Sequence, residues 1–152
     1  MDLKLKDEGN GGEVIYEDFD LTTIFGLGNL IYLALFGGNN GHVTPSVRAK
    51  NDQAFDFWAN SFLPAGQQFN SRTEHTISNV ALNSQGRAEI EKSAKKDLEF
   101  LSEFADVSVV VIIEDEKKCS INVQIDQPDN LENPTFRFIW DASSSELISE
   151  EI

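Results

Sequence analysis

The side chains of this chain that are capable of chemistry are few and scattered. Cys119 is the only cysteine, and His42 and His75 are the only histidines. A nucleophilic cysteine or serine needs a neighbouring base and a group that orients that base. No base stands at a recognisable spacing from Cys119, and both histidines fall at predicted surface positions. We therefore predict that the chain is not an enzyme.

The sequence also lacks the signatures of cofactor and metal sites. The pair Gly26 and Gly28 has no third glycine, and no strand leads directly into it, so it is not a dinucleotide-binding fingerprint. There is no phosphate-binding loop, and no cysteines and histidines with zinc-ligand spacing. We predict no cofactor and no metal ion. A single cysteine cannot form a disulfide within the chain, which fits a reducing compartment.

The chain is strongly acidic. It has 26 acidic against 12 basic residues, for a formal charge of −14 over 152 residues. Such a charge repels the phosphate backbone, and the lysines and arginines are too dispersed to form a basic surface, so we expect no nucleic-acid partner. The charge favours solubility, and it also fits a subunit whose protein partners present basic surfaces.

The most apolar segment is predicted to form a helix over residues 22–36. From residue 24 to residue 36, Asn29 is the only clearly polar side chain. A helix that is apolar on all sides must be buried, either in the core of its own domain or under partner chains. Its apolar run is shorter than the roughly 20 residues that span a bilayer, and the first residues do not resemble a signal peptide. We expect a soluble, non-secreted protein that does not enter a membrane.

The remaining patterns predict an α+β fold. A short N-terminal β-hairpin is expected to precede three helices: residues 22–36, one that Ser71 caps with Glu74 three positions on, and one that ends near residue 105. Three antiparallel strands should follow at residues 107–113, 121–125 and 136–140 and pack one face on the helices. We assign residues 1–141 to a single domain and residues 142–152 to an acidic, serine-rich tail that is disordered or becomes ordered on a partner.

Aromatic side chains supply the candidate contact residues. They are dense between residues 55 and 69 and alternate along the last predicted strand. Such side chains either fill a core or act as anchors in interfaces, where aromatic residues are enriched. Our interface candidates are Phe55, Phe57, Trp58, Phe62, Ser71, Arg72, Phe136, Phe138 and Trp140.

The order of these segments resembles a known family, the Mu-type phage proteins of the contractile-tail baseplate wedge. The resemblance covers roughly residues 2–140. It rests on Asp2-Leu3, Asp20-Leu21, an apolar helix end with a polar loop at residues 30–41, the aromatic segment 55–58, Ser71-Arg72, and an amphipathic helix that leads into strands at residues 98–113 and 121–125. The family usually has a tryptophan just after the Ser-Arg pair, where this chain has Thr73-Glu74-His75.

The resemblance implies a structural subunit of the virion, in the tail baseplate, assembled in the host cytoplasm. Its partners would be other wedge subunits, the tail sheath, and the hub or tube proteins, in many copies within a symmetric assembly. It could also start the sheath, because an exposed sheet edge accepts a strand from a neighbouring chain. Arg72 would take part in a polar contact near the aromatic segment.

Two other functions remain open from the residues alone. A cytoplasmic acidic adaptor or inhibitor of a basic protein would be a soluble monomer with a contiguous acidic patch. A small enzyme would require a deep pocket with converging polar groups.

Overall fold

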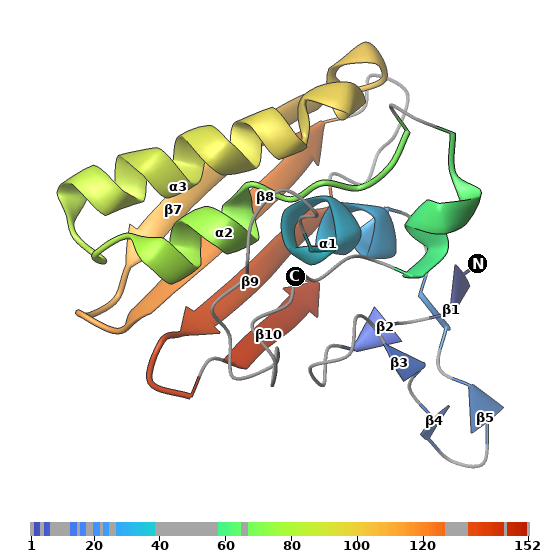
Figure 1. Cartoon of the computed structure of the whole chain (residues 1–152), viewed down its shortest axis with the longest axis horizontal. Helices are drawn as coiled ribbons and strands as arrows, with labels where there is room; N and C mark the ends of the chain where they lie inside the picture. Colours follow the sequence, from blue (N-terminus) through green and yellow to red (C-terminus); the bar gives the residue numbers. More distant parts are fainter. Residues whose placement is uncertain are drawn as a thin grey trace. The chain divides into compact units, whose positions relative to one another are not determined.

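The computed structural model describes residues 2–3, 5–6, 13–14, 16–17, 20–21, 23–24, 27–38, 58–64, 67–126, 134–144 and 146–151. The chain divides into two compact units, Met1–His75 and Thr76–Ile152. The described helices and strands give the α+β class that the sequence predicts, with three α-helices and a C-terminal antiparallel sheet (Figure 1).

Short strands pair in the N-terminal unit. The predicted hairpin corresponds to β2 and β3, in which Leu5 lies opposite Val14. Two further antiparallel pairs are present: β4 with β5, which follow the hairpin in sequence, and β1 with β6, which enclose both pairs. The bounds are β1 Asp2–Leu3, β2 Leu5–Lys6, β3 Glu13–Val14, β4 Tyr16–Glu17, β5 Asp20–Leu21 and β6 Thr23–Ile24.

The apolar helix is shorter than predicted. Helix α1 covers Gly28–Phe36, because Thr23–Ile24 form β6 and pair with β1 instead of opening the helix. β-Branched residues favour strands, and a glycine within a helix costs about 1 kcal/mol relative to alanine. Gly37 ends the helix, and a Cβ there would clash with the carbonyl oxygen of Leu33. Gly38 follows with φ of 87°, a backbone conformation that glycine adopts without strain.

Helix α1 is buried almost all round. Ile31 and Leu35 have no exposed surface, and Leu30 is the only helix residue that is not buried. The remaining helical elements of this unit are the 3-10 helix η1, Trp58–Phe62, and the start of α2, Thr73–Asn79, which continues into the second unit.

The second long helix of the prediction is divided in two. Helix α3 covers Ser84–Asp97, and the 3-10 helix η2 covers Glu99–Glu103. The α-helix begins at Ser84 because the Asn83 side chain accepts hydrogen bonds from the amides of Gln85 and Gly86, both 3.0 Å. This is an ordinary N-cap. Apolar residues recur at steps of three or four along this segment and form one buried stripe, which consists of Ile90, Ala94, Leu98, Leu101 and Ala105.

The C-terminal sheet is an antiparallel meander of order β10-β9-β8-β7. The three predicted strands are present, and a fourth, β10, is formed by residues that we assigned to the tail and pairs with β9. The bounds are β7 Asp106–Ile113, β8 Lys118–Asp126, β9 Thr135–Asp141 and β10 Glu146–Glu151.

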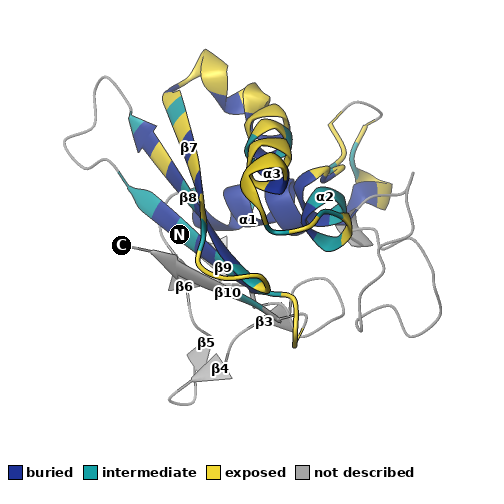
Figure 2. Cartoon of the chain, turned by 90° about the vertical axis from the view of Figure 1, so that its left-hand side faces the viewer, coloured by how far each residue is buried: buried dark blue, intermediate teal, exposed yellow. Residues whose placement is uncertain are grey.

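The inner face of this sheet is the core of the second unit. Helix α3 packs against β7, and its buried side faces the sheet while its exposed side faces solvent (Figure 2). Val111 lies opposite Ile121, which lies opposite Phe138, and all three side chains are buried. The period-2 alternation of the strands places the odd residues of β7 and β8 in this core.

Candidate protein interface

Strand β7 is the candidate interaction element of the second unit. It stands at one end of the sheet order, so β8 is its only neighbour among the described strands. Its exposure alternates along its length (Figure 2). Val109 and Val111 face the core, whereas Val110 is 49% exposed and Ile112 is 50% exposed. An edge strand that also exposes apolar side chains is a preferred site for association with another chain.

The outer face of the sheet carries one short apolar row beside this edge. The strand register sets Ile112 opposite Ser120, and Ser120 opposite Ile139. Ser120 is fully buried on this face, and its hydroxyl has no hydrogen-bond partner within the described part of the chain. The next row is more polar, since Val110 lies opposite Asn122. The apolar surface is therefore concentrated at the C-terminal half of β7.

Charged side chains flank this row. The Glu114 carboxylate, just after β7, lies 2.9 Å from an Arg137 guanidinium nitrogen and 3.9 Å from Lys118 Nζ. The Arg137 and Glu114 side chains are 35% and 30% exposed, so they form a partly shielded pair on β9 and the β7–β8 turn. Two cations thus hold one carboxylate at the end of the exposed row, which limits the negative charge there.

Helix α3 contributes a carboxylate beside the edge strand. Glu91 lies 2.7 Å from Lys95 Nζ and 3.5 Å from an Arg87 nitrogen. The hydrogen bond from Lys95 is the main cause that lowers the pKa of Glu91, and a hydrogen bond from the Val111 backbone adds to it. Glu91 therefore occupies part of the β7 edge, a common way in which proteins protect an edge strand.

The single thiol is a core residue. Cys119 has no exposed surface, and burial, with a smaller effect of the Glu114 charge, raises the pKa of its thiol to about 12. A thiol with so high a pKa is protonated at neutral pH and is a poor nucleophile. Cys119 accordingly serves packing in β8.

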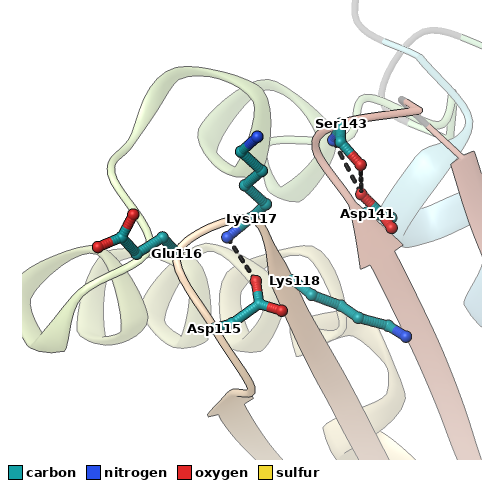
Figure 3. Close-up of a pocket in the computed structure, with 6 residues that line it drawn as sticks. All are labelled: Asp115, Glu116, Lys117, Lys118, Asp141 and Ser143. Carbon is teal, nitrogen blue, oxygen red and sulfur yellow. Dashed lines mark hydrogen bonds between the residues drawn. The ribbon is translucent and has the colours of Figure 1, made fainter.

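A surface depression of about 390 Å³ lies at the strand turns (Figure 3). Both of its aspartates are already engaged, because Asp115 accepts a hydrogen bond of 2.7 Å from the Lys117 amide and Asp141 accepts one of 2.8 Å from the Ser143 amide. The Ser143 hydroxyl is the first cause that lowers the pKa of Asp141. The residues that line the depression are Asp115, Glu116, Lys117, Lys118, Asp141 and Ser143. An exposed carboxylate with a lowered pKa is a poor general base at neutral pH.

In the N-terminal unit, Ser71 is a structural link. Its hydroxyl donates to the carbonyl oxygen of Leu35 and accepts a 3.2 Å hydrogen bond from the Glu74 amide. The predicted cap of Ser71 on Glu74 is thus present. The Glu74 carboxylate in turn accepts a 3.1 Å hydrogen bond from the Gly38 amide. Ser71 and Glu74 are both buried, and together they tie the end of α1 to the start of α2.

The other interface candidates fall into three groups. Phe55 and Phe57 lie outside the described residues, as does the side chain of Trp58 at the start of η1. Phe62 is 77% exposed, and Arg72 is exposed. The three aromatic residues of β9, which are Phe136, Phe138 and Trp140, are buried on the inner face, so they are packing residues of this chain and not surface anchors.

The sequence reasoning did not select the exposed apolar residues of β7. The signal was present, because residues 107–113 contain only one polar side chain, Ser108. A strand at the surface of an antiparallel sheet normally alternates apolar with polar residues. A continuous apolar run in an edge strand therefore indicates that both faces of the strand are apolar. The core of the domain covers one of these faces, and the other stays exposed.

Comparisons of the chain with protein-family models, with curated proteins and with solved structures found no match. None of the helices that the structure describes is long and apolar enough to cross a membrane. Among the described residues, no three His, Cys, Asp or Glu side chains are grouped so that they could hold a metal ion.

Proposed function

We propose that this chain is a structural subunit that works by protein–protein assembly, through strand β7 and its outward-facing side chains. The assembly we propose is the baseplate of a contractile phage tail, with the chain as a wedge component at the start of the sheath. The baseplate assignment rests on the sequence resemblance. The docking element rests on the geometry of the sheet.

One observation carries the proposed mode of action: an edge strand with half-exposed Val110 and Ile112. Apart from the Val111 amide, which hydrogen-bonds Glu91, the edge of β7 that faces away from β8 offers backbone amides and carbonyls to an extended partner segment. Apolar side chains on the outer face then add buried area and select the register. Pairing of strands needs no cofactor and no catalytic group, which fits a role in assembly.

The proposed partners are other wedge subunits, the tail sheath, and the hub or tube proteins. The chain would occur in several copies in a symmetric assembly within the virion, put together in the host cytoplasm. With a formal charge of −14, it should favour partners that present basic surfaces. We propose no nucleic-acid and no membrane partner.

The proposal is tested by co-expressing the full chain with the wedge, sheath and tube proteins of its own genome. We expect the wild-type chain to co-elute with at least one of them on size exclusion. Val110→Lys should abolish co-elution, because a lysine on an edge strand opposes pairing and Val110 is exposed enough for the fold to tolerate it.

The matched control is Gln85→Lys, which adds the same charge at an exposed position of α3. It should co-elute like the wild type. Co-elution that survives Val110→Lys, or a wild-type chain that elutes alone beside every one of these proteins, would refute the proposal.

The acidic charge favours a second candidate, an adaptor or inhibitor that binds a basic protein. That function predicts a monomer whose binding weakens steeply with salt, because screened surface charges would carry the affinity. It also predicts equal losses from Val110→Lys and Gln85→Lys, since both change the charge alike.

A further inference from the structure

A second set of exposed apolar side chains lies on η2 and just after it, in the link between α3 and β7 (Figure 1). Phe100 is 43% exposed and Phe104 is 70% exposed. The neighbouring Leu101 and Ala105 are buried, so the same turn anchors itself in the core with two small or aliphatic residues and presents two phenyl rings to solvent. We call Phe100 and Phe104 the η2 patch.

The backbone holds the η2 patch in a defined position. The Leu101 amide donates to the Leu98 carbonyl at 3.0 Å, and the Phe104 amide donates to the Leu101 carbonyl at 2.9 Å. The Ser102 hydroxyl donates a hydrogen bond of 2.6 Å to the Glu99 carbonyl oxygen in the same turn. Aromatic side chains on a hydrogen-bonded turn lose little conformational freedom when they bind, which is the advantage of preorganised anchors.

The ionisable side chains next to the patch in sequence are mainly acidic. From residue 98 to residue 106 the ionisable side chains are Glu99, Glu103 and Asp106, and none is basic. All three residues are exposed, and Glu99 already pairs with Lys96, whereas Glu103 and Asp106 form no ion pair within the described part of the chain. A second copy of this chain would bring the same acidic rim against it, and an anionic lipid surface would also be repelled. A ligand that matches the patch must be apolar in its centre and basic at its margin.

We propose that the η2 patch docks a basic amphipathic helix of another protein, with Phe100 and Phe104 as anchors and the Glu103 and Asp106 carboxylates pairing with lysines or arginines beside its apolar stripe. Aromatic anchors surrounded by complementary charge are the usual composition of such sites. The occupant is thus an amphipathic cationic segment, a different chemistry from an extended strand on β7.

This surface is separate from the outer row of β7. Five residues lie between Phe104 and Val110, and the part of β7 from Asp106 to Val110 alone spans about 13 Å, at about 3.3 Å per residue. The η2 patch and the outer row of β7 are thus different surfaces, through which the chain would join two different partners. The inference goes beyond the proposed function and does not depend on it.

The probe is a synthetic 18-residue helix of leucine and lysine with one apolar face, titrated into the full-length chain and followed by NMR of the phenylalanine rings and by calorimetry. We expect the peptide to shift the Phe100 and Phe104 signals. The double variant Phe100→Ser/Phe104→Ser should bind at least tenfold more weakly, as expected when aromatic anchors are lost. The matching helix of leucine and glutamate should not bind.

The charge-preserving design of this variant separates the patch from general acidity. Wild type and variant have the same formal charge, so a peptide that merely collects on the acidic surface binds both alike, and that result overturns the inference. No shift of either ring at millimolar peptide also overturns it. Phe62→Ser, an exposed phenylalanine in η1, is the control and should bind like the wild type.

Discussion

Two apolar segments of this chain differ sharply in how much of their surface is buried. Helix α1 is buried along almost its whole surface, whereas β7 has a buried face and a face with half-exposed Val110 and Ile112. Both segments read as apolar runs in the sequence. The comparison shows that an apolar run predicts burial of a helix more firmly than burial of a strand.

Geometry explains the difference. A helix distributes successive residues all round its axis, so a helix without a polar side has to be surrounded to be stable in water. A strand places alternate residues on two faces, and a single layer of helices covers only one of them. The inner residues of β7 stabilise the fold. Its outer residues contribute little to stability in the isolated chain and are available for a partner.

The largest expected effect is in α1. Leu35→Ala should lower the free energy of unfolding by about 2–5 kcal/mol, because the side chain is fully buried and its removal leaves a cavity. Ile112→Ala on the outer face should cost less than about 1 kcal/mol. Urea denaturation of both variants measures the contrast. Equal losses in the free energy of unfolding for the two variants would contradict the distinction between α1 and the outer face of β7.

A smaller effect is expected at the link between α1 and α2. Ser71→Ala removes the hydroxyl that bonds the Leu35 carbonyl and the Glu74 amide, and should cost about 2 kcal/mol. Asn70→Ala, at the exposed neighbouring position, should be close to neutral when the same unfolding curves are recorded. A loss at Asn70 as large as that at Ser71 would contradict the structural role.

The inner face of the sheet can be probed by pH. Burial raises the pKa of Cys119 from 9.0 to about 12 in the folded chain. Below pH 9 the thiol is protonated in both the folded and the unfolded chain, so it does not make stability depend on pH. Above pH 9 the thiol of the unfolded chain ionises first, which lowers the free energy of unfolding. We expect the wild type to lose about 1.4 kcal/mol more than Cys119→Ala between pH 7 and pH 10. Parallel pH profiles of the two proteins would show that the thiol is not buried. At pH 8, thiol reagents should modify the folded wild type far more slowly than the urea-unfolded chain.

The sequence predicted most of the second unit and less of the first. The stripe from Ile90 to Ala105 and the alternation on β8 follow from helical and strand periodicity, and the structure confirms both. The predicted start of α1 was wrong, because Thr23–Ile24 form a strand that pairs with β1. The local sequence pattern does not encode this contact. For the same reason β10 was not predicted, since half of its residues 146–151 are acidic and the segment becomes a strand by pairing with β9.

The candidate surface was predictable only in part. Its location on a sheet edge was expected, but our interface residues on β9 proved to be core residues. Alternation alone does not reveal which of two faces the helices cover. The aromatic face of β9 was taken for an anchor set, and the true outer face is marked by Val110 and Ile112 on β7. Ser71 was selected correctly as a helix cap, and its bond to Leu35 required the tertiary structure.

The most direct test of the assembly role is amide hydrogen exchange along β7, in the free chain and in its complex with the wedge or sheath protein of the same genome. Backbone amides on the open edge should exchange readily in the free chain, apart from that of Val111, which hydrogen-bonds Glu91. The account predicts that the complex protects the β7 amides strongly while those of α1 are unchanged. Unchanged exchange along β7 in a complex that protects other segments would contradict it.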